Sequence, residues 1–349
     1  MTSTEDRFLK ACRREPVDRT PVWFMRQAGR YMPEYRAIRE KHTLLEICAQ
    51  PEIAAEVTLQ PVNALEIDAA IIFADILLPL VPMGIQLRFA QGEGPVIDNP
   101  VRTAADVDAL QVLDPDEATP ATLDAIRIVT RELNGRMPLI GFAGAPFTVA
   151  SYMIEGGSSR NYLRTKGMMH GEPELWDRLM SKLADMTSRY LRGQIAAGAG
   201  AVQIFDSWGG ALGPYDYRTR VLPYVKRIVD DVKPTGVPVI LFGTSTAGIL
   251  PVLAEAGSDV LGVDWRIDLQ AAWNLIGHDR AIQGNLDPAL LFGPRDELDR
   301  HVQRILREVS GTPGHIFNLG HGILPETPVE NVQFVAERVH ELTDRAVIR

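Results

Sequence analysis

The stretch "AVQIFDSWGG", residues 201–210, decides the fold class of this chain. Its first five residues are apolar except for Gln203, and they run directly into Asp206, Ser207 and two glycines. A continuous apolar run of strand length, rather than an alternation of apolar and polar residues, is typical of a strand buried on both faces of a parallel sheet. We therefore expect a strand at 201–205 that ends in a polar loop.

The same pattern recurs along the whole chain. Short apolar runs are each followed by a loop and then by a longer segment with helical apolar spacing, such as 172–198, where leucines 175, 179 and 183 recur at four-residue steps. Eight strand–helix units close most economically into a (β/α)8 barrel, so we expect residues 1–349 to form one α/β barrel domain of this type. The eight expected strands are 21–24, 69–73, 138–142, 201–205, 238–242, 259–263, 280–284 and 315–319.

An open doubly wound sheet is the alternative arrangement of such units. It is less favoured because no Gly-x-Gly-x-x-Gly phosphate loop follows any expected strand; "GFAGAPF" at 141–147 comes nearest. One segment departs from the strand–helix alternation: residues 84–101 contain two extended runs around Gly92, Glu93 and Gly94. We interpret this segment as a β-hairpin inserted after the second strand.

Composition limits the partners of the chain. Its 349 residues carry a formal net charge of -9, with a pI of about 5.4, whereas nucleic-acid binding requires a basic face. Cys12 and Cys48 are too few for a disulfide framework, no apolar signal sequence is visible at the N-terminus, and the apolar stretch 69–85 is interrupted by one aspartate and two prolines. We expect a cytoplasmic protein that binds neither nucleic acid nor membrane.

Polar side chains follow each of the expected strands. In a (β/α)8 barrel the active site lies at the carboxyl ends of the strands, so these residues are the candidates for a site. Each also has a structural interpretation: Asp75 as a helix cap, His321 as a backbone-bonded histidine, Ser207 as a cap and Tyr152 as a core residue. In chain order the candidates are Arg26 and Arg30, Asp75, Tyr152, Asp206 and Ser207, Thr244 and Ser245, Asp264 and Arg266, Asn285 and Asp287, and His321.

The arginine pair in "MRQAGR", residues 25–30, is the hardest of these features to explain structurally. On a helix Arg26 and Arg30 would repel each other, whereas Gly29 favours a loop. Two guanidiniums at a barrel mouth suit bidentate recognition of carboxylate or phosphate. The six lysines lie away from the strand ends, which disfavours a Schiff-base enzyme, and the two cysteines lie too early in the chain for a thiolate zinc site.

The chain resembles the uroporphyrinogen decarboxylase family over essentially its whole length. The resemblance is carried by residues 21–36, 73–77, 141–157, 203–214 and 317–328. It implies a substrate-binding loop at Arg26, Gln27, Ala28, Gly29 and Arg30, a central carboxylate at Asp75, and further substrate contacts from Tyr152, Ser207 and His321. Asp206 stands where other members may carry Glu. The resemblance also implies a homodimer that uses no metal and no organic cofactor.

The implied reaction removes carbon dioxide from four acetate groups of uroporphyrinogen III, giving coproporphyrinogen III in haem biosynthesis. A pyrrole ring can be its own electron sink once it is protonated, and an ionised Asp75 would stabilise the resulting cation through the pyrrole N–H groups. Arg26 and Arg30 would hold peripheral carboxylates. The proton donor stays open among Arg26, His321 and Tyr152, and we favour Arg26.

Two other functions compete with this interpretation. A cobalamin-dependent methyltransferase of a related barrel family would need a His/Cys zinc cluster near the late strands, and the chain has no cysteine after residue 48. A non-catalytic tetrapyrrole carrier could use the same arginines and Asp75. Release of carbon dioxide from supplied uroporphyrinogen separates the carrier from the decarboxylase.

Overall fold

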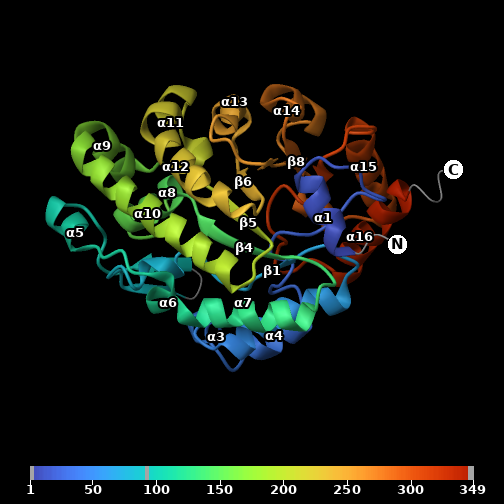
Figure 1. Cartoon of the computed structure of the whole chain (residues 1–349), viewed down its shortest axis with the longest axis horizontal. Helices are drawn as coiled ribbons and strands as arrows, with labels where there is room; N and C mark the ends of the chain where they lie inside the picture. Colours follow the sequence, from blue (N-terminus) through green and yellow to red (C-terminus); the bar gives the residue numbers. More distant parts are fainter. Residues whose placement is uncertain (1–3, 91–93, 345–349) are drawn as a thin grey trace.

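A parallel sheet curls through the centre of the molecule (Figure 1). In the computed structural model, which describes residues 4–90 and 94–344, seven strands pair in parallel in the order β1-β4-β5-β6-β7-β8-β9. All seven overlap strands expected from the sequence, so the parallel α/β architecture is confirmed. Their bounds are β1 Ala70–Ile71, β4 Leu139–Gly144, β5 Ala201–Asp206, β6 Val239–Gly243, β7 Val260–Gly262, β8 Ala281–Gln283 and β9 His315–Ile316.

The eighth expected strand, residues 21–24, closes the ring between the last strand and the first. Val22 forms an isolated parallel bridge with Phe317, just beyond β9, and Phe317 N donates to Pro21 O at 2.9 Å. On its other side Val22 O accepts a hydrogen bond from Asp68 N, just before β1, at 2.7 Å. The segment therefore takes the eighth place in the barrel, although only a single bridge marks it as a strand.

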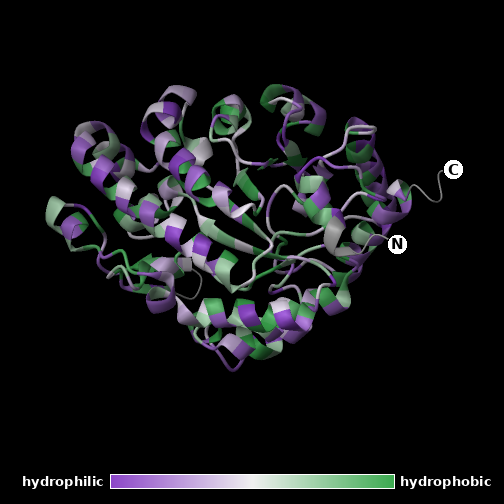
Figure 2. Ribbon diagram, in the orientation of Figure 1, coloured by the Kyte–Doolittle hydropathy of each residue, from purple (hydrophilic) through white to green (hydrophobic). Residues whose placement is uncertain are grey.

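Helices cover the outside of the barrel (Figure 1). Figure 2 shows purple and green residues mixed along most of them, which is the mark of an amphipathic helix with one face on the core. The helix expected within 172–198 is α10, Pro173–Ala197, so that prediction is confirmed. The others are α1 Thr4–Cys12, α2 Pro33–Arg39, α3 Leu44–Cys48, α4 Pro51–Ala64, α5 Ala104–Ala109, α6 Pro115–Ala118, α7 Pro120–Leu133, α8 Pro146–Glu155, α9 Leu163–Gly171, α11 Pro214–Arg220, α12 Leu222–Val232, α13 Leu250–Ala254, α14 Leu269–Ile276, α15 Arg295–Glu308 and α16 Val329–Thr343.

Short 3-10 helices stand in several of the loops. They are η1 Leu78–Leu80, η2 Gly209–Ala211, η3 Lys233–Thr235, η4 Ala247–Ile249 and η5 Pro288–Phe292.

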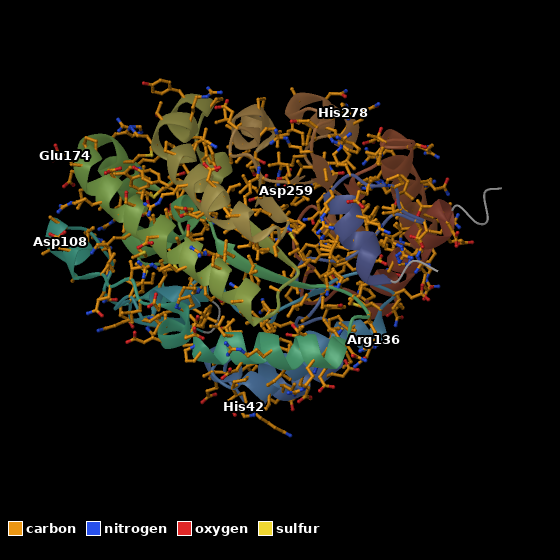
Figure 3. The ribbon with its side chains drawn as sticks, in the orientation of Figure 1. His42, Asp108, Arg136, Glu174, Asp259 and His278 are labelled. Carbon is orange, nitrogen blue, oxygen red and sulfur yellow. The ribbon has the colours of Figure 1, made fainter. Side chains whose placement is uncertain are left out.

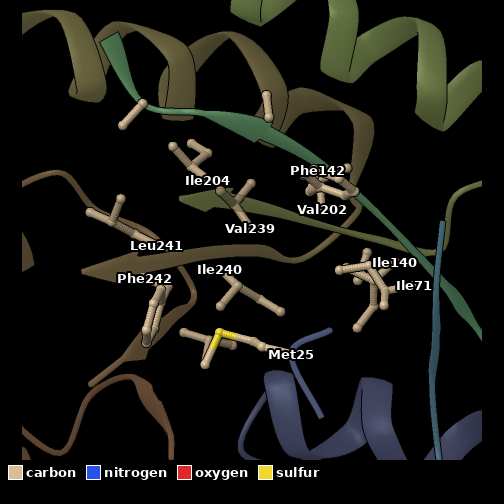
Figure 4. Close-up of a cluster of buried hydrophobic side chains, with 14 of the residues drawn as sticks. Met25, Ile71, Ile140, Phe142, Val202, Ile204, Val239, Ile240, Leu241 and Phe242 are labelled. Atoms are coloured by element: carbon tan, nitrogen blue, oxygen red, sulfur yellow. The ribbon is translucent and has the colours of Figure 1, made fainter. Parts of the chain in front are cut away.

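The strands are buried on both faces, as their continuous apolar sequences predict. Figure 4 shows Ile240 and Phe242 on the same side of β6 as Met25, while Val239 lies on the side of Val202. All five of these apolar side chains are at most 3% exposed. Because successive side chains of a strand point to opposite faces, β6 packs against the barrel interior with one set and against the helices with the other.

An antiparallel pair of strands follows β1 in the chain. β2, Leu87–Ala90, pairs with β3, Gly94–Ile97, in a register that places Leu87 opposite Ile97. Residues 91–93, which include the expected turn positions Gly92 and Glu93, lie outside the described residues. Ile97 N donates to Gly156 O at 2.9 Å, so β3 lies against the chain just after α8.

Charged side chains cover the outer surface. Asp108, Arg136, Glu174 and His278 are exposed and lie around the periphery of the molecule (Figure 3). Among the helices in the described part of the chain, none combines the length and apolar character that a membrane span requires.

Candidate active site

Residues 25–30, which follow the expected strand 21–24, form a turn, and the buried side chain of Gln27 anchors this turn. The Gln27 side chain is fully buried: its Oε1 accepts from Phe24 N at 3.0 Å, and its Nε2 donates to Ala69 O at 3.1 Å. Its backbone oxygen accepts from the Tyr31 hydroxyl at 2.8 Å. Gln27 thus ties the arginine loop to the first strand region, and a direct substrate contact by this residue stays a prediction.

Arg26 is exposed at the end of this anchored turn and adopts an unusual backbone conformation. Its φ is +61°, a region that non-glycine residues rarely occupy and that often marks functional positions. A Cβ placed on Gly322 would lie 2.4 Å from Arg26 Cδ, so the Arg26 side chain runs directly over the loop that follows β9. Arg30 is also exposed, and its backbone oxygen accepts from Arg36 Nη1 at 3.1 Å.

Asp75 lies in the loop after β1 and is half-buried. Its Oδ1 accepts from Leu77 N at 2.9 Å. The N-cap residue of η1 is Leu77, so Asp75 does not occupy the cap position of that helix. No hydrogen bond to Asp75 Oδ2 is found in the described part of the chain. Burial raises the pKa of Asp75, and the Leu77 N–H and the positive charge of Arg26 oppose this rise. The carboxylate therefore keeps Oδ2 available for a hydrogen bond, and the positive charge of Arg26 stabilises its ionised form.

Tyr152, on α8, stacks against Trp208. Their ring centroids are 3.9 Å apart with an interplanar angle of 31°, and the ring centroid of Tyr162 lies 5.1 Å from that of Trp208. Burial raises the pKa of Tyr152 to about 12, with Asp75 adding to the rise and Arg26 opposing it. Tyr152 therefore lies within the electrostatic reach of both Asp75 and Arg26.

Asp206 supports the loop that carries Ser207 and Trp208. It is fully buried, and its two oxygens accept from the hydroxyls of Thr148 and Tyr217, each at 2.8 Å. Thr148 Oγ1 also accepts from Trp208 N at 3.1 Å. Burial raises the pKa of Asp206, and these hydrogen bonds oppose the rise. Asp206 is thus a structural anchor, while Ser207 stays half-buried beside it.

His321 lies between two glycines in the loop after β9. A Cβ on Gly320 would lie 2.5 Å from Trp265 N, and one on Gly322 would overlap Arg26, so both glycines are required for this close packing. Burial lowers the pKa of His321, the charges of Arg26 and Arg266 lower it further, and Asp264 opposes them. The imidazole is therefore neutral at neutral pH.

Four of the residues expected to form the site are linked through Arg26, whose charge acts on Asp75, Tyr152 and His321. They come from three different loops and one helix, at the carboxyl ends of the strands. Ala28, Gly29 and Arg30 lie in the same loop as Arg26, and Ser207 lies in the loop after β5; within the described part of the chain, no hydrogen bond or ion pair joins their side chains to those of these four. Trp208 is not among the residues expected from the sequence, and only its position just after a strand could have indicated it.

No group of three or more His, Cys, Asp or Glu residues able to hold a metal ion occurs within residues 4–90 and 94–344. Both cysteines, Cys12 and Cys48, are buried.

Comparisons with known proteins give one consistent family. The family model described as uroporphyrinogen decarboxylase matches residues 3–342. A protein of that name from Carboxydothermus hydrogenoformans is 58% identical over 338 residues, covering 97% of this chain and 97% of its own length. Another from Sorangium cellulosum is 58% identical over 337 residues, covering 97% of this chain and 96% of its own.

Solved structures with low sequence identity share the fold. A methyltransferase from Methanosarcina mazei superposes with a TM-score of 0.82 at 20% identity, covering 98% of this chain and 99% of its own. A B12-independent methionine synthase from a Shewanella species gives a TM-score of 0.51 at 10% identity, covering 76% of this chain and 75% of its own. These matches concern the architecture alone.

Proposed function

The chain belongs to the uroporphyrinogen decarboxylase family, and we propose how its barrel mouth converts uroporphyrinogen III into coproporphyrinogen III. The enzyme is a carboxy-lyase of porphyrin and haem biosynthesis. It removes the carboxyl groups of four acetate side chains as carbon dioxide and leaves four methyl groups. Each of these steps replaces one carboxylate by one proton on the same carbon.

The observation that supports the proposed roles is that the charge of Arg26 acts on Asp75, Tyr152 and His321, which follow three different strands at the carboxyl end of the barrel. One carboxylate with an unoccupied oxygen stands among one guanidinium, one phenol and one neutral imidazole. An eight-carboxylate tetrapyrrole with four central N–H groups is complementary to this arrangement: cations are needed at its periphery and an anion at its centre.

Asp75 is the central anion in this proposal. Protonation of the pyrrole carbon beside the acetate-bearing carbon makes the ring a cation, and the electrons of the breaking C–C bond flow into it as carbon dioxide leaves. A second proton then adds to the exocyclic carbon, and the first is lost from the ring. Asp75 accepts hydrogen bonds from the pyrrole N–H groups and stabilises the cation by preorganised electrostatics, which requires the ionised carboxylate.

Arg26 and Arg30 hold peripheral carboxylates, with Gln27, Ala28 and Gly29 forming the rest of the binding loop. We assign the proton delivery to Arg26. Arg26 is protonated and positively charged, and its charge acts on Asp75, whereas the lowered pKa of His321 leaves the imidazole neutral at neutral pH. Tyr152, Ser207 and His321 then serve as polar contacts to the substrate.

Because the protonated pyrrole is itself the electron sink, the reaction as proposed needs neither a metal nor an organic cofactor. We further propose that the enzyme is a cytoplasmic homodimer and that residues 1–349 act as one domain. One hydrophobic cluster extending from Phe8 to Val339 supports the single domain. Sedimentation at micromolar concentration tests the dimer: a species of one chain mass would contradict it.

Anaerobic incubation with uroporphyrinogen III tests the activity directly. The products are oxidised to porphyrins, and their carboxyl groups are counted by chromatography. The decarboxylase produces a tetracarboxylate porphyrin and carbon dioxide. Recovery of intact octacarboxylate bound to the protein would instead support the tetrapyrrole carrier, and recovery without binding would contradict both.

A further inference from the structure

Arg266 is an arginine of the barrel mouth that lies outside the substrate-binding set expected above. It follows β7, and its backbone N and guanidinium Nη1 both donate to the carboxylate of Asp264, the former at 3.1 Å. Asp264 is only 2% exposed and also accepts from Ser245 N at 2.6 Å. The Arg266 guanidinium lies 4.0 Å from the centroid of the Trp265 ring.

These contacts fix the guanidinium in place. An ordinary surface arginine that is paired with a mobile carboxylate stays conformationally free, and such an ion pair contributes little to the stability of the fold. Here the carboxylate partner is buried and held by two backbone N–H groups, and an aromatic face lies beside the cation. The side chain is nevertheless 47% exposed. Its remaining N–H donors are therefore held in a defined position without being covered by protein.

The fixed guanidinium lies on the same rim as Arg26. The His321 loop joins the two: Gly320 packs against the backbone of Asp264 and Trp265, and Gly322 packs against the Arg26 side chain. The charges of Arg26 and Arg266 both act on the imidazole of His321. Arg26, His321 and Arg266 thus belong to one segment of the rim, in which the buried Asp264 carboxylate is the counter-charge of Arg266.

We propose that Arg266 is a further substrate-binding residue, which holds one peripheral carboxylate of the tetrapyrrole, and that Asp264 is its positioning residue. The inference deepens the proposed function and rests on it, because the ligand is one of the eight carboxylates of that substrate. A planar guanidinium with preset geometry suits a carboxylate that must be held in one orientation while another acetate reacts.

Kinetics of Arg266→Gln and Arg266→Lys on uroporphyrinogen, with Arg304→Gln as control, test this subsite. Arg304 is similarly exposed, at 44%, and likewise paired with carboxylates, but it lies on the outer helix α15. We expect KM to rise about 5- to 10-fold in Arg266→Gln, with kcat within about twofold of wild type. Lysine keeps the charge but not the planar fork, so it should restore KM only in part.

A second measurement does not depend on turnover. Uroporphyrin, the oxidised and unreactive octacarboxylate, is titrated against wild type and Arg266→Gln, and tryptophan fluorescence reports binding. We expect Arg266→Gln to bind it about 5- to 10-fold more weakly and Arg304→Gln to bind it as wild type does.

An unchanged KM in Arg266→Gln overturns the subsite, and so does a loss confined to kcat. If wild type releases no carbon dioxide, the proposed function fails by itself and the titration decides the subsite. In that case a weaker affinity of Arg266→Gln supports it, whereas equal affinities, or no binding to wild type, overturn it.

Discussion

At the scale of single residues, the environment of Asp75 makes the activity depend on pH in a defined direction. Burial raises the pKa of Asp75, so its carboxylate protonates at a higher pH than an exposed aspartate does. Because the ionised form is the active one, kcat/KM should fall as the pH drops through this raised pKa. Arg26→Gln removes the charge that opposes the rise, so the acid limb should move to still higher pH.

The pH profile of kcat/KM on uroporphyrinogen, taken from the residual turnover in Arg26→Gln, measures this shift through the position of the acid limb rather than its height, and Arg30→Gln is the matched control. Arg30 is not among the groups that shift the pKa of Asp75. Its replacement should weaken binding but leave the acid limb in place. A limb that stays fixed in Arg26→Gln, or moves equally in both variants, would refute the coupling of Arg26 to Asp75.

The lowered pKa of His321 argues against this residue as the proton donor. Its pKa is lowered by burial and by Arg26, so the imidazole is neutral at neutral pH and has no proton of the required acidity to deliver. We expect His321→Asn to retain the shape of the pH profile while KM rises. Disappearance of a limb from the profile of this variant would reassign the acid to His321.

At the scale of elements, a buried cluster joins β5, α8 and α11 beneath the Ser207–Trp208 loop. Asp206 accepts from Thr148 and Tyr217, and all three side chains are fully buried. Tyr217→Phe removes one donor from a buried carboxylate, so we expect the free energy of unfolding to fall by about 1–3 kcal/mol. Urea denaturation measures it.

Tyr215→Phe is the control for this prediction, since Tyr215 lies on the same helix but is 77% exposed. Its effect should stay within about 0.5 kcal/mol. Equal effects of the two substitutions would show that the buried hydrogen bond contributes nothing to stability.

The elements themselves were largely predictable from local sequence. Strands β5 and β6 match the apolar runs 201–205 and 238–242 within one residue at either end, because burial on both faces leaves a continuous apolar signal. The role of Gln27 was not predictable. Its carboxamide bonds to Ala69, 42 positions away, and nothing in "MRQAGR" shows which of its polar side chains points inward.

At the scale of the whole molecule, closure of the barrel depends on a buried charge cluster around Asp68. Asp68 accepts from Val22 N, from His340 Nε2 and from the Arg7 guanidinium, and Arg7 also pairs with Asp18. The cluster joins the N-terminal helix, the C-terminal helix and the segment at 21–24. Because Asp68 is 0% exposed and Arg7 only 6%, loss of either charge leaves the other buried with only part of its compensation.

We expect Arg7→Met to lower the free energy of unfolding by about 3–5 kcal/mol. Arg178→Met, which removes an exposed partner of Asp108, should cost at most about 1 kcal/mol. Thermal and urea unfolding compare the two. A loss in Arg7→Met no larger than that in Arg178→Met would contradict the closing role of the cluster.

The cluster also sets the acid stability. The hydrogen bond from Arg7 lowers the pKa of Asp18 to about 2; burial acts to raise that of Asp68, but His340 and Arg7 outweigh it and lower it. Depressed carboxyl pKa values stabilise the fold above the unfolded-state value of about 4, and this stability is lost as pH falls toward the folded values. Stability measured between about pH 4 and pH 2 should therefore fall less steeply in Arg7→Met than in wild type. An equal slope would show that Arg7 does not depress these values.

Placement across the molecule is what the sequence could not provide. The order of polar residues after the strands indicated a site at the barrel mouth, but not that Arg266 is fixed by Asp264 or that Trp208 stacks on Tyr152. Those contacts depend on how loops far apart in the chain meet after the barrel has closed. Local patterns therefore predicted the list of candidates better than their contacts.

Single-turnover release of carbon dioxide from uroporphyrinogen by Asp75→Asn, compared with wild type, tests whether the Asp75 carboxylate stabilises the pyrrole cation. Asparagine nearly preserves the size of the side chain but removes the charge that would stabilise the pyrrole cation. With thermal stability retained and substrate still bound, we expect the rate to fall by about 10²- to 10³-fold. A rate close to that of wild type would contradict this role of Asp75.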